Sequence, residues 1–164
     1  MLCSIFALPG RGARGGEDAV IAARQAQGCA EPWREPSFLD AVAVLQYRRQ
    51  VAADSRGPVQ LHDRSPLCTL ALARYQRRST GPALRAELDR IARLRTYQRL
   101  VFLISPLGSI RHTPARRISY AESLAFARVH KQVYDEYGHH LVDVPAGPLW
   151  KRVAVIERHV SWPT

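Results

Sequence analysis

The stretch Leu100-Val101-Phe102-Leu103-Ile104 is a continuous apolar run without polar residues at alternate positions. Such a run is typical of a strand that is covered on both faces, as in the middle of a parallel sheet. Outward from this run, strand-like and helix-like patterns alternate along the chain. Short strands are predicted at 59–63 and 140–144, and helices at 67–77, 83–95, 119–137 and 149–159. The sequence therefore predicts an α/β domain with a parallel sheet and helices on both faces.

Local signals mark the ends of several of these helices. Pro66 suits the first position of a helix, where its missing N–H costs nothing. Ser119 stands three residues before Glu122, which is the spacing of a capping box. Gly138 is a natural stop for the helix that Ser119 starts. Earlier in the chain, helices are predicted at 19–27 and 37–53, with a turn at 31–36.

Length and composition limit the classes of protein to which the chain can belong. Its 164 residues, 46% of them hydrophobic, are enough for one globular domain with a full core. No apolar run approaches the roughly 20 residues that cross a bilayer, so we expect no membrane partner. The start of the chain lacks the features of a secretory signal, so we predict a cytoplasmic location. Cys3, Cys29 and Cys68 follow no metal-binding or disulfide spacing, which favours reduced thiols.

The charge of the chain is strongly positive, with a formal net charge of +10. Between Arg74 and Arg99, eight arginines accompany only two acidic residues, Glu87 and Asp89. Such a surface could face phosphates, but arginines on helices mostly form a solvated face. The sequence also lacks the interleaved aromatic residues of a single-strand binder and any zinc-finger motif. We therefore expect no nucleic-acid partner and keep a nucleic-acid-binding or interaction module as the alternative function.

Asp63-Arg64-Ser65 follows a predicted strand and is the first candidate site. Ligands of open parallel sheets bind beyond the carboxyl ends of the strands, where loops and helix N-termini converge. There, Asp63 could hold a magnesium ion or accept a proton from a hydroxyl nucleophile, and Arg64 could neutralise phosphate charge. The alternative is structural: the three residues form a turn that caps the helix starting at Pro66.

The segment 111–117, Arg-His-Thr-Pro-Ala-Arg-Arg, is the second candidate site. It follows the 100–104 strand and precedes a long helix, the place where small nucleotide kinases carry a mobile lid. Arg111, Arg116 and Arg117 could close on a triphosphate and stabilise charge during phosphoryl transfer. The alternative is a loop with exposed charges.

Ordered motifs along the chain resemble the NadR-type AAA domain, a group of P-loop ATPases related to nucleoside and ribosylnicotinamide kinases. The resemblance covers roughly residues 19 to 160. The motifs that carry it are Gln25-Ala26-Gln27-Gly28, Pro32-Trp33, Phe38, His62-Asp63-Arg64-Ser65-Pro66, Cys68-Thr69-Leu70-Ala71, Tyr75, Val101-Phe102-Leu103-Ile104, the segment 111–117, Tyr134, Gly138, Val144-Pro145 and Arg152.

The resemblance implies an α/β P-loop domain that binds ATP with Mg²⁺. Such a domain either phosphorylates a small molecule or protein acceptor, which the sequence does not identify, or uses the nucleotide as a switch. By this resemblance, Asp63 and Arg64 would be catalytic, Asp63 would also bind the metal, and Arg111, Arg116 and Arg117 would bind the nucleotide. The chain departs from the family at one place: it contains no GxxxxGK[ST] phosphate loop. The missing loop lysine argues against full catalytic competence and leaves open whether this chain is an enzyme.

Two interpretations of the first residues compete. In one, residues 2–8 are a first strand and Gly10 to Gly16 a degenerate phosphate loop, with Gly16 at the place of the lysine. In the other, which we favour, residues 1–16 are an atypical segment and the AAA domain, residues 17–164, is truncated at its N-terminus. By the resemblance, the helix that contains Gln25 comes after the family's second strand. The residues before it in this chain are too few for a phosphate loop, a first helix and that second strand. Truncation would remove the central strand, leave its neighbours unpaired and favour oligomerisation.

Overall fold

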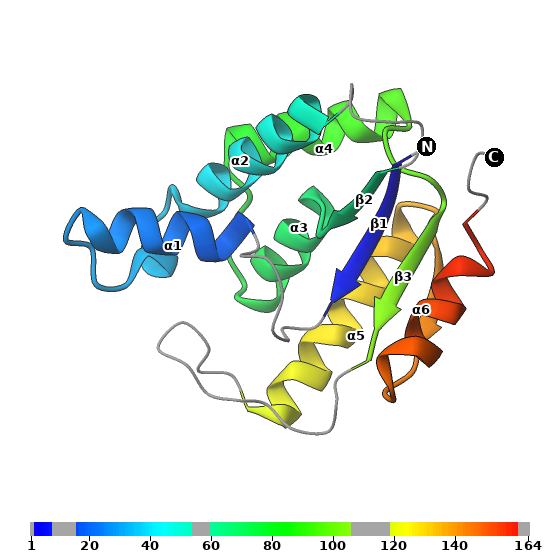
Figure 1. The fold of residues 1–164 in the computed structure, drawn as a ribbon. Helices are drawn as coiled ribbons and strands as arrows, with labels where there is room; N and C mark the ends of the chain where they lie inside the picture. Colours follow the sequence, from blue (N-terminus) through cyan, green and yellow to red (C-terminus); the bar gives the residue numbers. More distant parts are fainter. Residues whose placement is uncertain (1, 8–15, 54–59, 106–118, 161–164) are drawn as a thin grey trace.

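The computed structural model describes residues 2–7, 16–53, 60–105 and 119–160. For residues 2–7 and residue 16 it describes the backbone only. Four parallel strands form one sheet in the order β2-β1-β3-β4 (Figure 1). The strands are β1 (Leu2–Ala7), β2 (Gln60–Asp63), β3 (Leu100–Ile104) and β4 (His140–Val144). The predicted α/β class with a parallel sheet is confirmed, and β3 lies inside the sheet as its apolar run predicts.

Helices connect the strands and make up most of the described chain. They are α1 (Gly16–Ala26), the short 3-10 helix η1 (Pro32–Arg34), α2 (Phe38–Ala53), α3 (Pro66–Tyr75), α4 (Pro82–Leu94), α5 (Tyr120–Glu136) and α6 (Leu149–Glu157). Each predicted helix is present within a few residues of its expected bounds. None of the helices within the described ranges is long and apolar enough to span a membrane.

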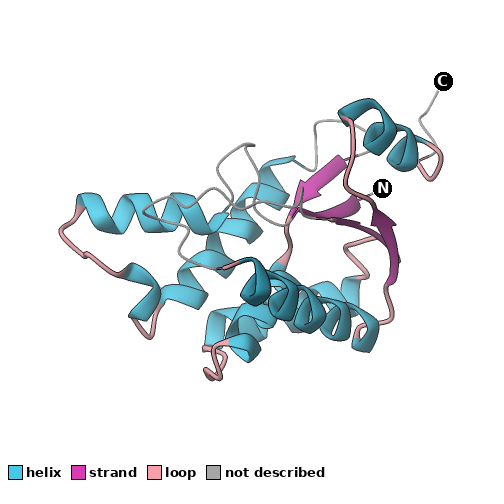
Figure 2. Ribbon diagram, turned by 90° about the horizontal axis from the view of Figure 1, so that it is seen from below, coloured by secondary structure: helices cyan, strands magenta, loops and turns pink. Residues whose placement is uncertain are grey.

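The two faces of the sheet carry cores of unequal size. Val101 and Leu103 of β3 belong to the large core, to which α1 to α5 contribute. Phe102 and Ile104 point the other way, because side chains alternate along a strand, and they join a smaller core with Val144, Val160 and α6. Figure 2 shows α6 on one side of the sheet and the larger helical layer on the other. Helices therefore lie on both faces, as predicted.

The ends of the helices confirm the local sequence signals. Ser119 Oγ accepts a hydrogen bond from Glu122 N (3.2 Å), and Glu122 Oε2 accepts one from Ser119 N (2.7 Å). This is the predicted capping box. Pro66 stands in the first turn of α3. Gly138 adopts a positive φ of 73° just after the end of α5, a conformation that favours glycine.

Our favoured interpretation of the first residues is wrong in one respect: the central strand is present. Leu2–Ala7 form β1, which pairs with β2 on one side and β3 on the other. The sheet therefore has no gap between β2 and β3, and the predicted reason for oligomerisation falls away. The other interpretation, in which residues 2–8 are a first strand, is confirmed for this strand, whereas its degenerate phosphate loop falls largely outside the described residues. The division of the chain at residue 16 stays a prediction, because residues 8–15 lie outside the described residues.

Helix α1 occupies a peripheral place. It packs against α2 and η1 and extends away from the strands (Figure 1). A helix that directly follows a phosphate loop packs closely on its own strand. Residues 8–15, which join β1 to α1, lie outside the described residues, so whether the helix containing Gln25 takes the place of a phosphate-loop helix stays open.

Candidate functional site

Asp63 is the last residue of β2 and lies at the carboxyl edge of the sheet. Its side chain reaches the surface. Partial burial of the carboxyl group raises its pKa, Arg64 and Arg49 oppose this rise, and the nearby Asp18 adds to it. The start of α1 is therefore close to the end of β2. The position agrees with the strand-end site expected from the sequence.

Arg64 has a different environment from its neighbour. Its backbone is left-handed (φ 69°), which is uncommon for a residue other than glycine. Its guanidinium Nη1 donates to Glu17 Oε1 at 2.9 Å, and the two side chains are only 11% and 18% exposed. Burial disfavours the charge of Arg64, but Glu17, Asp63 and Asp18 raise its pKa. Arg64 thus holds the first turn of α1 against the end of β2.

Ser65 starts α3 in the way that the structural alternative predicts. Its Oγ accepts a hydrogen bond from Leu67 N (3.2 Å) and lies 2.8 Å from Tyr134 OH, in a second hydrogen bond. The Cys68 thiol is 3.2 Å from the same phenol. Burial raises the pKa of Cys68, so this thiol stays protonated and inert near neutral pH. These contacts fix the backbone that carries Asp63.

Gln46, a buried polar residue behind this turn, was not singled out by the sequence analysis, and it contacts Thr69 of the Cys68-Thr69-Leu70-Ala71 motif. Gln46 Nε2 donates to Ser65 O (3.3 Å), and Thr69 Oγ1 donates to Gln46 Oε1 (3.0 Å). Gln46 lies on the buried face of α2, where a polar residue inside a helical apolar pattern was the available signal. The contacts join α2 to the start of α3.

The donor set at this edge fits a magnesium ion that arrives with a phosphate ligand. Mg²⁺ is usually held by one or two carboxylates plus water and substrate phosphates. Asp63 supplies an accessible carboxylate, with Asp18 nearby, whereas Glu17 is engaged by Arg64. Within the described residues no group of three or more His, Cys, Asp or Glu could hold a metal ion by itself. The donor set at Asp63 thus fits an ion that is also held by phosphate and water.

The two candidate sites of the sequence have different outcomes. Asp63 and Arg64 lie together at the carboxyl edge, at the start of α1 and α3. Arg111, Arg116 and Arg117 lie outside the described residues, so the lid stays a prediction.

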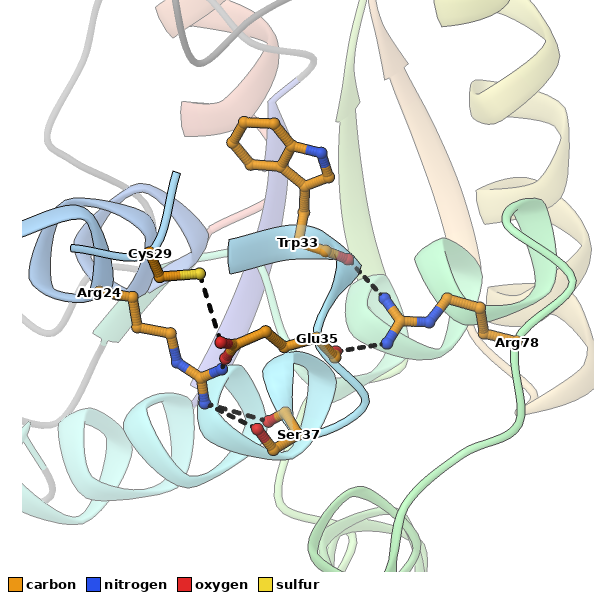
Figure 3. A network of polar contacts seen from close by, with 6 residues as sticks. All are labelled: Arg24, Cys29, Trp33, Glu35, Ser37 and Arg78. Atoms are coloured by element: carbon orange, nitrogen blue, oxygen red, sulfur yellow. Dashed lines mark hydrogen bonds and ion pairs between the residues drawn. The ribbon is translucent and has the colours of Figure 1, made fainter. Parts of the chain in front are cut away.

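The arginines of the 74–99 stretch are partly engaged in intramolecular contacts. Arg74 pairs with Glu136 (2.7 Å), and Arg90 pairs with Glu87 (2.7 Å). Arg78 donates to the backbone carbonyls of Trp33 (2.6 Å) and Glu35 (2.5 Å). Figure 3 shows that Arg78 thereby joins a network in which Arg24 pairs with the Glu35 carboxylate and donates to Ser37, while Cys29 Sγ donates to Glu35. These cations hold α1, η1 and α3 together.

Asp63 lies at the carboxyl edge of a parallel sheet, beside two helix N-termini, where ligands of open α/β sheets bind. A family model described as AAA domain matches residues 18–152. The chain belongs to this AAA domain family. Membership makes it a P-loop-like protein of a nucleotide-binding family. The match includes Asp63 and Arg64 but not β1 or the run from Gly10 to Gly16. Comparisons with curated proteins and with solved structures found no match.

Proposed function

We propose that this AAA domain binds ATP with Mg²⁺ at the carboxyl edge of its sheet, and that its phosphoryl-transfer activity is low in the chain as it stands. The observation that carries the proposal is the place of Asp63: an accessible carboxylate at the end of a parallel strand, beside the first turns of α1 and α3. This is where ligands of open α/β sheets bind.

Asp63 is the group we propose to act on the nucleotide. A carboxylate with a pKa above its ordinary value accepts a proton more readily than a fully solvated one. It is also the ligand type that Mg²⁺ prefers. When bound, the magnesium ion would neutralise charge on the phosphates. We assign Arg64 a positioning role, because its guanidinium is largely buried and paired with Glu17.

Weak binding follows from the missing phosphate loop. No GK[ST] sequence is present anywhere in the chain, so the lysine and the hydroxyl group of a phosphate loop are missing. Each charge-assisted hydrogen bond contributes about 1.5 to 3 kcal/mol, so the loss of two or three removes roughly 3 to 9 kcal/mol, or about two to six decades in affinity. The lid arginines Arg111, Arg116 and Arg117 would add phosphate contacts, but screened loop charges do not replace a cradle of backbone donors.

The resemblance to small-molecule kinases supports a proposal for the class of molecule that accepts the phosphoryl group. We propose a small hydroxyl-bearing molecule, with a protein acceptor or a nucleotide switch as the remaining alternatives. A nucleic-acid-binding role gains no support, because Arg74, Arg78 and Arg90 contact groups of this chain.

Titration calorimetry with ATP and Mg²⁺ at physiological salt tests the proposal. We expect saturable binding with a dissociation constant in the high micromolar range or weaker. In a phosphate-release assay, Asp63→Asn should lower the residual turnover while changing the affinity only a few fold. Asp89→Asn, which removes an exposed carboxylate on α4, is the matched control and should change neither.

Three results would overturn parts of this proposal. A sub-micromolar dissociation constant would refute the loss of the phosphate cradle, and the absence of saturable binding would refute nucleotide binding. If Asp63→Asn unfolds the domain while turnover per folded molecule is unchanged, Asp63 is a structural residue.

A further inference from the structure

A pocket lies at the opposite edge of the sheet from Asp63. It has a volume of about 200 Å³ and is lined by the last residues of α4, the connection to β3, and the turn between α5 and β4. Because all four strands are parallel, residues that precede β3 and β4 lie at the amino edge, whereas Asp63 follows β2 at the carboxyl edge. The pocket is therefore separate from the proposed nucleotide site.

Two arginines give this pocket its charge. Arg95 and Arg99 line it, and both are exposed. Within the described part of the chain, no hydrogen bond or ion pair engages either guanidinium. Other arginines of the 74–99 stretch differ from these two, because Arg74 and Arg90 each have a carboxylate partner at 2.7 Å. Planar guanidinium donors that are not used within the protein match the geometry of a phosphate group.

The backbone at Arg95 is a second, independent observation. Arg95 ends α4 in a left-handed conformation, with φ 48° and ψ 46°, a position that usually holds glycine or asparagine. An arginine is uncommon in this conformation, because its Cβ crowds the backbone. Backbone outliers of this kind concentrate at binding sites. The carbonyl of Ile91 already accepts hydrogen bonds from the N–H groups of Arg95 and Thr96, so the helix end does not need the Arg95 side chain as a cap.

The rest of the wall is aromatic and open. Tyr97 is buried, Tyr137 is 37% exposed, and His139 is half-buried. His139 Nδ1 donates to Gln98 O (3.0 Å), which fixes the ring. A Cβ at Gly138 would meet no atom within 4 Å, so that side of the pocket is open space. The pocket thus offers two cations at its rim beside rings that exclude water from one side.

We propose that this pocket binds a small phosphate-bearing anion, of the size of pyrophosphate or a simple phosphate monoester, between Arg95 and Arg99. Its volume is below the roughly 300 to 1,000 Å³ of sites that enclose drug-sized ligands, which favours a small anion over a whole nucleotide. The proposal does not depend on the nucleotide site at Asp63.

The test is titration calorimetry of the full chain with inorganic pyrophosphate at physiological salt. A double variant, Arg95→Gln with Arg99→Gln, removes the two proposed donors. Arg85→Gln with Arg93→Gln removes the same charge from exposed positions of α4 outside the pocket. We expect saturable binding in the wild type, a loss of about tenfold or more in the first variant, and a change of less than about twofold in the control.

Each other outcome overturns the proposal. Equal weakening in both double variants would mean that only net charge matters. Binding that is unaffected by the first variant would place the anion elsewhere, and no saturation up to about 10 mM would mean that the pocket is not a site. A single-stranded oligonucleotide serves as a third arm: tighter binding than pyrophosphate, weakened equally by both variants, would indicate a nucleic-acid surface. Circular dichroism melting checks that both variants are folded.

Discussion

At residue 64 the chain takes a left-handed turn that separates the surroundings of Asp63 and Arg64. The sequence placed both at a strand end and left open whether they form a catalytic or a structural turn. In the structure, Arg64 pairs with Glu17 and Ser65 caps α3, whereas Asp63 stays accessible. The partner of Arg64 was not predictable, because Glu17 lies 47 residues earlier and only the packing of α1 brings it near.

Removing one partner of the ion pair between Arg64 and Glu17 should destabilise the fold, because the other charge would stay buried without a counter-charge. Glu17→Gln leaves a buried guanidinium without its counter-charge and should lower the free energy of unfolding by about 2 to 3 kcal/mol. Replacing both residues by Met should cost less than the single change, because no uncompensated charge remains. Urea unfolding of Glu17→Met, Arg64→Met and the variant with both changes measures this coupling. Additive effects would show that the pair is not coupled.

At the scale of elements, helices and strands were predictable where local chemistry agrees with the fold. The apolar run 100–104 and the capping box at Ser119 each correspond to an element. For the strand at 2–7, the apolar sequence allowed a strand, but its central place comes from pairing with β2 and β3, which the local pattern does not show. Its neighbours in the sheet come from residues 60–63 and 101–104, far away in sequence.

The capping box makes a measurable contribution to α5. Ser119→Ala removes the acceptor for Glu122 N and should lower the free energy of unfolding by about 1 kcal/mol. Ser79→Ala is the matched control, since Ser79 lies exposed before α4. A lower melting temperature is expected for the first variant alone. Equal melting temperatures would show that the cap contributes nothing.

At the scale of the whole molecule, stability should depend on pH through His130. This residue of α5 is fully buried, packs edge-on against Phe126, and its Nδ1 donates to Phe126 O at 2.9 Å. Burial lowers the pKa of His130 to about 3. The folded state therefore keeps the ring neutral, whereas the unfolded chain binds a proton below about pH 6.5. Stability from this group is complete above pH 6.5 and is lost progressively as the pH falls toward 3.

Urea unfolding at pH 7 and pH 5 measures this dependence. His130 should account for a loss of about 2 kcal/mol between the two pH values. His130→Leu should reduce the loss, and His140→Gln, at an exposed histidine, should not. An unchanged pH dependence in His130→Leu would show that His130 is not responsible.

The position of the nucleotide is the central claim at this scale. Hydrogen–deuterium exchange of the Arg95→Gln, Arg99→Gln double variant, with and without saturating ATP and Mg²⁺, tests it without interference from the second pocket. We predict slower exchange of the amides in residues 63–67, which join β2 to α3, and no change at residues 137–139 of the opposite edge. Unchanged exchange at 63–67 under conditions where calorimetry shows saturation would contradict a nucleotide site at the carboxyl edge of the sheet.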